Sequence, residues 1–151
     1  MATPETSIAQ REQNTEMFRH LIQEAFSKGN VTVVDDVAAA YCVEHQAGIE
    51  PANTEGLKAQ IKLLHQLMPD FTCTVEDLMA VGDKVWARLR GRGTHQGAFM
   101  GRPPTGNVIT VDVMDICRFE DGKIVEHWGV PDRLSMLEQM GIVPKPAPAA
   151  V

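Results

Sequence analysis

Several features that define other protein classes are scarce or missing in this sequence of 151 residues. Basic residues are outnumbered, since 14 lysines and arginines against 20 acids give a formal net charge of −6. Nucleic acids and anionic membranes both require a basic surface, so neither is an expected partner. Apolar residues never run together for the roughly 18 positions of a membrane span, and no secretory signal begins the chain. We expect a cytoplasmic protein with a small, weakly charged partner.

Signatures of cofactor-dependent and nucleophilic enzymes are also missing. The five histidines and three cysteines show no HxH, HExxH or CxxC spacing, so we predict no metal site and three buried thiols. The segment "RGTHQGAFMGRPPTG" (residues 92–106) is rich in glycine, but no Gly-Lys-Ser/Thr and no helix start follow it, which excludes a phosphate loop. The GxSxG elbow of serine hydrolases is missing too. No cofactor is predicted.

What the sequence contains is a change of hydrophobic period, from 3.6 residues in its first half to 2 in its second half. Spacings of three and four predict helices, and strict alternation predicts strands. The expected helices span residues 8–28, 34–41, 54–68 and 133–140, and the expected strands span residues 70–81, 84–95, 107–119 and 123–129. Residues 42–53 are expected to form a short strand or a loop. Asp121-Gly122, between the last two strands, is a strong two-residue hairpin signal.

This order of elements predicts an α+β fold in which N-terminal helices cover one face of a cone-shaped, curved antiparallel sheet. We expect one domain over residues 1–143, followed by a Pro/Ala-rich tail over residues 144–151. Segment 92–106 is expected to shape the entrance of the conical cavity. The convex face of such a sheet is usually too apolar to remain in water, which predicts a homodimer with contacts from Met114, Ile116 and Val125.

Four segments carry a family resemblance: "PDFTCTVEDLMAVGDKV", "GTHQGAFMGRPPTG", "DICRFEDGKIVEHWG" and "MLEQMG", together with the arginine at position 88. Over residues 14–143 the chain resembles the SnoaL-like polyketide cyclase group of the NTF2-like (ketosteroid isomerase-like) superfamily. The resemblance implies an NTF2-like, cystatin-like α+β barrel. An acid commonly follows the "HW" pair in sequences of this type, whereas Gly129 stands there in this chain.

For the cyclases, the resemblance implies acid–base chemistry without a cofactor. A carboxylate in an apolar pocket takes a proton next to a carbonyl, the enolate attacks within the same molecule, and neighbouring groups hold the oxyanion. The superfamily is similar in shape but also includes isomerases, epoxide hydrolases, dehydratases and proteins that only bind ligands. A fold match therefore does not determine the reaction.

Asp115 is the leading candidate for the base. If the last hairpin has regular register, Asp115 lies opposite Trp128 on the face with most of the branched apolar residues, and His127 lies on the other face. A carboxylate enclosed in a narrow apolar pocket becomes a better base because it has lost water, and such a base contributes roughly 10²–10⁴-fold in rate. The alternative is a buried ion pair of Asp115 with Arg88 or Arg90.

Three histidines are candidate partners of that base because imidazole titrates near neutral pH. His45 follows the second predicted helix, where it either faces the cavity or belongs to a capped loop. His95 stands where a strand enters segment 92–106, and we expect it to position substrate at the rim. His127 can act as a base or an oxyanion donor, although the face assignment points it toward a core or an interface.

Four further side chains have both a functional and a structural interpretation. Tyr41, the only tyrosine, either offers its hydroxyl to a bound carbonyl or packs as an amphipathic ring. Trp128 is expected to form a flat wall for substrate or part of the core. Arg88 begins a run of three alternating arginines that form either cross-strand ion pairs or a clamp for a substrate anion. Asp132 is either catalytic or the N-cap of the last helix, a contact worth roughly 1 kcal/mol.

Three functions follow from these residues. The first is an enzyme, such as a cyclase or isomerase, that acts on a small apolar carbonyl compound with Asp115 as the base. The second is a protein that binds a similar ligand without transforming it. The third is epoxide or hydration chemistry, with Asp115 and Arg88 arranged around a water molecule.

Overall fold

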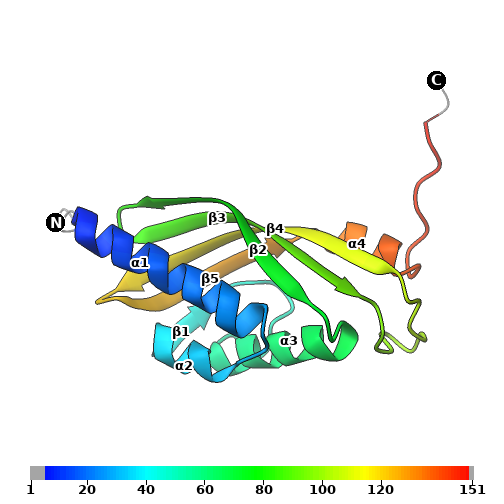
Figure 1. Cartoon of the computed structure of the whole chain (residues 1–151), viewed down its shortest axis with the longest axis horizontal. Coiled ribbons are helices and arrows are strands. Elements are labelled where there is room, and N and C mark those ends of the chain that lie inside the picture. The colour runs from blue at the N-terminus through cyan, green and yellow to red at the C-terminus, as the bar shows by residue number, and fades with distance from the viewer. Residues whose placement is uncertain (1–5, 150–151) are drawn as a thin grey trace.

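The computed structural model describes residues 6–149 and shows helices packed on one curved five-stranded sheet (Figure 1). Its first elements are helix α1 (Ile8–His20), the π-helical turn η1 (Leu21–Phe26), helix α2 (Thr32–Val37), strand β1 (Ala38–Glu44) and helix α3 (Thr54–Leu67). Strands β2 (Thr72–Val81), β3 (Lys84–Thr94), β4 (Val108–Glu120) and β5 (Lys123–Pro131) and helix α4 (Arg133–Gln139) follow. The α+β prediction is confirmed.

The ends of the predicted domain and tail, residues 1–5 and 150–151, lie outside the described residues. Residues 144–149 form neither helix nor strand. Within residues 6–149, no helix is both long and apolar enough to cross a bilayer.

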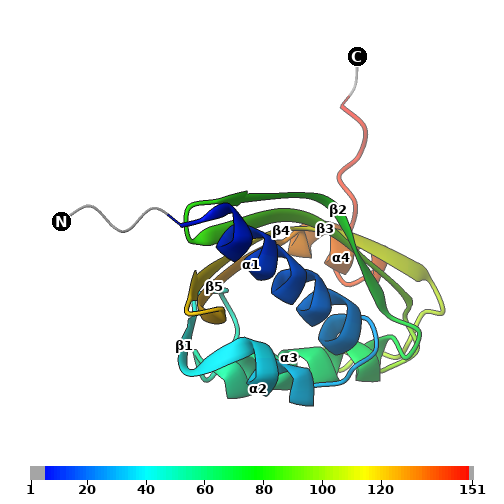
Figure 2. The same cartoon turned by 60° about the vertical axis from the view of Figure 1, so that its left-hand side comes forward.

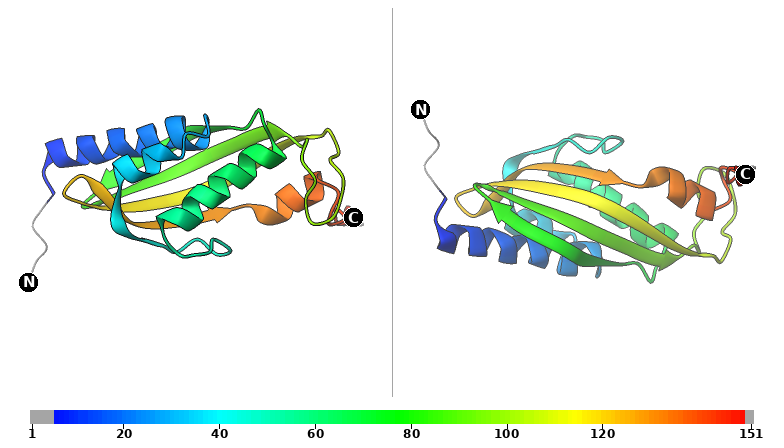
Figure 3. Two further views of the ribbon diagram at one scale, coloured as in Figure 1. Left: turned by 90° about the horizontal axis from the view of Figure 1, so that it is seen from below. Right: turned by 90° about the horizontal axis from the view of Figure 1, so that it is seen from above.

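The sheet has the order β1-β5-β4-β3-β2, with antiparallel pairing throughout except for β1, which runs parallel to β5. Helices α1, α2 and α3 lie across its concave face, as the end-on view and the view from below show (Figures 2 and 3). Seen from above, the sheet lies in front of these helices (Figure 3). The sheet therefore has an inner face toward the helices and an outer face away from them.

The prediction of a helix over residues 34–41 was wrong beyond Val37. Helix α2 ends there, and Ala38–Glu44 forms β1, which pairs with β5 through Glu44 and His127. Three consecutive alanines favour a helix locally, but tertiary pairing overrides a propensity of this size. The consequence is that Glu44 enters the sheet beside His127.

The β4–β5 hairpin departs from regular register by one residue. Its turn has positive φ at Asp121 (49°) and Gly122 (75°), as a two-residue hairpin turn requires. Phe119 then pairs with Ile124, whereas Arg118 pairs with Glu126, so Val125 is an extra residue in β5. Such a bulge moves every later residue of the strand to the opposite face.

Candidate active site

A narrow apolar cavity lies between the inner face of the sheet and helix α3. Its volume is about 100 Å³, which is small beside the roughly 300–1,000 Å³ of typical ligand pockets. The apolar lining is Phe26, Ile49, Leu57, Leu64, Met68, Phe71, Leu89, Val111, Val113, Pro131 and Met136, with Gly91. The polar or ionisable side chains that line it are Gln46, Gln60, Cys73, Asp115, His127 and Arg133.

Among residues 6–149, three of the five buried polar side chains meet beside this cavity. The imidazole of His127, on β5, lies between two carboxylates: its Nε2 is 2.8 Å from Oδ1 of Asp115 on β4, and its Nδ1 is 2.6 Å from Oε2 of Glu44 on β1. Each of the three residues is at most 5% exposed. Glu44 also accepts a hydrogen bond of 2.8 Å from the backbone N–H of Gln46. The sheet order explains the group, because β1, β5 and β4 are neighbours.

The two carboxylates keep His127 protonated. Complete burial by itself lowers the pKa of an imidazole, but the charges and hydrogen bonds of Asp115 and Glu44 outweigh it and raise the pKa of His127 to about 10. At neutral pH His127 is therefore an imidazolium that donates one hydrogen bond to each carboxylate. The group therefore places one imidazolium between two carboxyl groups in an apolar setting.

The bulge decides which predicted residues share this group. Asp115 faces inward as expected, but it pairs with Gly129 rather than Trp128, and His127 lies on the same face. The expectation that His127 points away from the cavity was therefore wrong. Trp128 lies on the outer face, where its ring stacks on His45 with centroids 4.7 Å apart. His45 also pairs with Glu126 at 3.1 Å, outside the cavity.

The other predicted substrate contacts also lie elsewhere. Tyr41 is 68% exposed on the edge strand β1. Arg88 pairs with Asp77 at 2.7 Å on the outer face, as the ion-pair interpretation predicted. Asp115 lies opposite Ala87, so the buried pairing of Asp115 with an arginine was wrong.

Asp132 and His95 have local structural contacts. The Asp132 side chain accepts a hydrogen bond of 3.0 Å from the backbone N–H of Ser135 and caps α4, and it does not line the cavity. His95 is 1% exposed, with Nδ1 3.0 Å from the hydroxyl of Thr105 across the base of the glycine-rich loop. Its Nε2 has no hydrogen-bond partner among residues 6–149. This loop contributes no residue to the cavity lining.

Sequence reasoning missed Glu44 and Gln46. Both lie in residues 42–53, which were predicted as a short strand or a loop with no pairing partner, so nothing placed them beside Asp115. Arg133 was missed as well: its guanidinium donates to the carbonyl of Ala47 and joins α4 to the loop that carries Gln46. A strand assignment for "AYCVE", with Glu44 at an inward position, was the signal that could have found the first of these residues.

One group of side chains has the composition of a metal site. Ligand atoms of Asp115, Cys117 and His127 lie within 4.8 Å of one another, a proximity that the sequence spacing did not reveal because two strands supply it. Both nitrogens of His127 already contact carboxylates at hydrogen-bond distance. A metal ion would have to replace the proton between His127 and Asp115, so this geometry fits a proton better than a cation.

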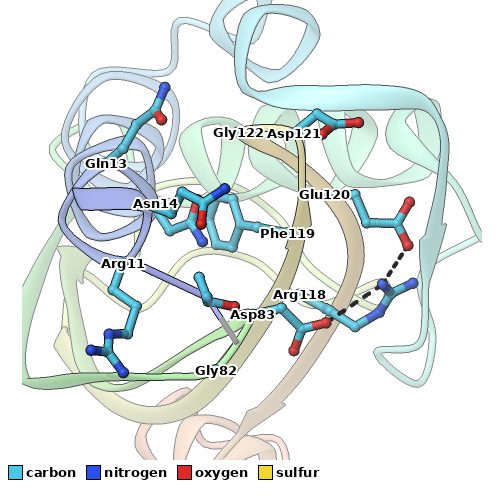
Figure 4. A pocket seen from close by; sticks show the side chains of 12 residues that line it. Arg11, Gln13, Asn14, Gly82, Asp83, Arg118, Phe119, Glu120, Asp121 and Gly122 are labelled. Carbon is cyan, nitrogen blue, oxygen red and sulfur yellow. Dashed lines mark hydrogen bonds and ion pairs between the residues drawn. The ribbon is translucent and has the colours of Figure 1, made fainter. Parts of the chain in front are cut away.

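A larger hollow of about 970 Å³ lies at the other end of the sheet, between α1 and the β2–β3 and β4–β5 turns (Figure 4). In the close-up, Asn14 and Phe119 lie together at its centre, and Arg118 pairs with Glu120 and Asp83 at one side (Figure 4). Its charged groups are at least partly exposed. It does not offer the dry carboxylate that acid–base chemistry at carbon requires, so the smaller cavity is the better candidate.

Comparisons with known proteins agree with the fold. The sequence profile of the SnoaL-like polyketide cyclase family matches residues 16–140. IdmH of Streptomyces antibioticus, a proposed polyketide cyclase, is 34% identical, with a TM-score of 0.77 over 85% of this chain and 99% of its own. AclR of Streptomyces galilaeus, a proposed hydroxylase, is 27% identical, with a TM-score of 0.79 over 93% and 87%. Among curated proteins none matches.

Proposed function

Because the chain belongs to the SnoaL-like polyketide cyclase family, with a cyclase-type function, we propose that it is an enzyme acting by acid–base catalysis on a small apolar carbonyl compound. The single observation that carries this proposal is the buried group Glu44–His127–Asp115 at the wall of an apolar cavity. The proposed reaction needs no cofactor. The cavity volume favours a compact substrate, or one whose reacting end alone enters.

In the proposed reaction Asp115 is the base. Its carboxylate takes a proton from the carbon next to the substrate carbonyl, and the C–H electron pair becomes the enolate, with negative charge on oxygen. The enolate carbon then attacks a second carbonyl carbon of the same molecule, and the new alkoxide takes the proton from Asp115. Such proton transfer contributes roughly 10²–10⁴-fold in rate.

His127 and Glu44 have supporting roles in this proposal. The imidazolium holds Asp115 through Nε2 and keeps the carboxylate oriented toward the cavity. Glu44 fixes the imidazole from the other side and offsets its charge. This arrangement positions a base without a mobile loop, because all three residues belong to paired strands.

Deuterium exchange tests the proposal without knowledge of the natural substrate. The protein is incubated in D2O with cyclopentanone, 2-indanone and 2-tetralone, enolisable ketones of increasing size, and the α-hydrogen signal is followed by NMR. We expect wild-type protein to accelerate exchange of at least one ketone, and Asp115→Asn to lose roughly 10²-fold or more of that rate. Asp112→Asn is the matched control, since Asp112 lies on the outer face and pairs with Arg90.

The outcomes separate the alternatives. Exchange that survives Asp115→Asn would contradict the role of Asp115. Ketone binding without exchange would favour the non-catalytic binding protein. The epoxide or hydration alternative has lost its main support, because Arg88 lies on the outer face with Asp77.

The homodimer also remains a proposal, and two of its predicted contacts, Met114 and Ile116, lie on the outer face, where Met114 is 56% exposed. A row of apolar side chains crosses the outer face through successive strand pairs, formed by Met79, Trp86, Ile116 and Trp128. Met79 is 61% exposed, whereas the predicted contact Val125 is buried, so Val125 is corrected to a core residue. Light scattering should show a dimer for wild type and a monomer for Ile116→Glu, while Leu134→Glu on α4 leaves the dimer intact. A monomeric wild type would contradict it.

A further inference from the structure

The loop after β1 brings a second polar group to the candidate base. Gln46 follows Glu44, a member of the buried group, by two positions, and its backbone N–H donates to the Glu44 carboxylate at 2.8 Å. The neighbouring backbone N–H, of His45, donates to the carbonyl oxygen of His127 at 2.8 Å. The backbone at residue 46 is therefore fixed to the same residues that hold Asp115.

Gly129 makes room for the side chain of Gln46. It lies opposite Asp115 in the β4–β5 pair. A Cβ at position 129 would be 2.1 Å from Oε1 of Gln46 and 3.1 Å from Oδ1 of Asp115. The Gln46 amide and the Asp115 carboxylate thus flank the same point, and the amide fills the space that any side chain at 129 would need.

The Gln46 amide is available to a ligand. Its side chain lines the cavity and makes no hydrogen bond within residues 6–149, whereas its backbone N–H does. The oxygen end of the amide lies over Gly129, which leaves the NH2 end as a donor. The neighbouring imidazole of His127 has no donor to spare, since both of its nitrogens contact carboxylates.

We propose that Gln46 is a catalytic residue whose amide N–H donates a hydrogen bond to the substrate oxygen that becomes negative when Asp115 removes the proton. This rests on the proposed function, and it defines the substrate class further as one whose carbonyl oxygen and acidic C–H reach Gln46 and Asp115 together. A neutral amide suits this task because it stabilises the oxyanion without competing for the proton. One such preorganised donor is worth roughly 10²–10³-fold in rate.

The test uses the ketone that wild-type protein exchanges fastest. Gln46→Ala should lower kcat for exchange by roughly 10²-fold and change KM much less, because the donor acts mainly on the charged state. Gln66→Ala is the matched control: Gln66 is an exposed glutamine on α3 that does not line the cavity, and its loss should leave kcat within about threefold of wild type.

A double substitution separates the role of the amide from general damage. Gly129→Ala should lower kcat because its new Cβ displaces the Gln46 amide. If that is the cause, Gly129→Ala combined with Gln46→Ala should be no slower than the slower single variant. Thermal unfolding of each variant verifies that it is folded.

Three results would overturn the inference. Unchanged kcat in Gln46→Ala excludes an oxyanion contact, and fully additive losses in the double variant would mean that Gly129 acts through Asp115 instead. Wild-type protein that exchanges no ketone would remove the proposed function and this inference with it, whereas exchange that depends on Asp115 but not on Gln46 would remove the inference alone.

Discussion

The buried imidazole of His127 should make the folded chain less stable as pH rises from 6.5 to about 10. The folded state has the higher pKa and holds the extra proton. The resulting stabilisation is complete below the pKa of the unfolded state and is lost as pH rises through that of the folded state. At 1.36 kcal/mol per pKa unit, the rise from 6.5 to about 10 corresponds to on the order of 5 kcal/mol. That is a large part of the roughly 5–15 kcal/mol that stabilises a typical domain.

Urea unfolding at a series of pH values between 6.5 and 10 measures this loss directly. Glu44→Gln keeps the contact to Nδ1 but removes one of the two charges, so its stability should begin to fall at the same pH, level off at a lower pH than wild type and fall by a smaller total. His20→Gln is the control, because His20 is exposed and its loss should leave the wild-type profile unchanged. NMR of the His127 imidazole should show no deprotonation near neutral pH. A ring that titrates near 6.5, or a stability that stays constant across the range, would refute the reasoning.

Three further predictions concern single positions. Asp132→Ala should cost roughly 1 kcal/mol in urea unfolding through loss of the α4 cap, with the exchange rate kept, and a large rate loss would restore a catalytic role for Asp132. Gly56→Ala should lower the melting temperature, because the new Cβ would lie 1.9 Å from the carbonyl oxygen of Pro51. A higher melting temperature would mean instead that the helix preference of alanine outweighs this clash. The thiols should resist Ellman's reagent in the native protein at neutral pH and react after unfolding. The reason is that burial raises the pKa of Cys42 to about 11, that of Cys73 to about 12 and that of Cys117 well above 9.0. Fast labelling of the native protein would contradict this prediction and show that the core opens.

Most of the fold could be predicted from the sequence because long periodic segments determine it. Helix α3 and the four antiparallel strands lie within a few residues of their predicted ranges. The error at β1 has a different origin. Its three alanines have no strong strand pattern, and the segment forms a strand because it pairs with the edge of β5. Pairing between Glu44 and His127, which are 83 residues apart in the chain, leaves little trace in local periodicity.

The candidate site was predictable only in part. Asp115 could be placed inward from the alternation of β4 alone, which is a local property. The inward position of His127 depends on the extra residue Val125, and a buried valine beside a buried isoleucine gives no sign in the sequence of which one is extra. Glu44 could be placed beside His127 only with both the pairing of β1 to β5 and this register. The contacts of the base were therefore missed because strand pairing alone brings its partners together, although the residue types are suited to the chemistry.

The extra residue in β5 determines which side chains face the interior as well as the path of the strand. If Val125 paired regularly with Arg118 instead, every later residue of β5 would shift by one, bringing an indole inward and sending the imidazole out to solvent. Two registers of the same hairpin would then enclose either the buried ionisable group or an inert aromatic side chain. Among proteins of this shape with the same spacing between the Asp-Gly turn and the His-Trp pair, the presence of the extra residue should thus separate those with a reactive interior from those without one.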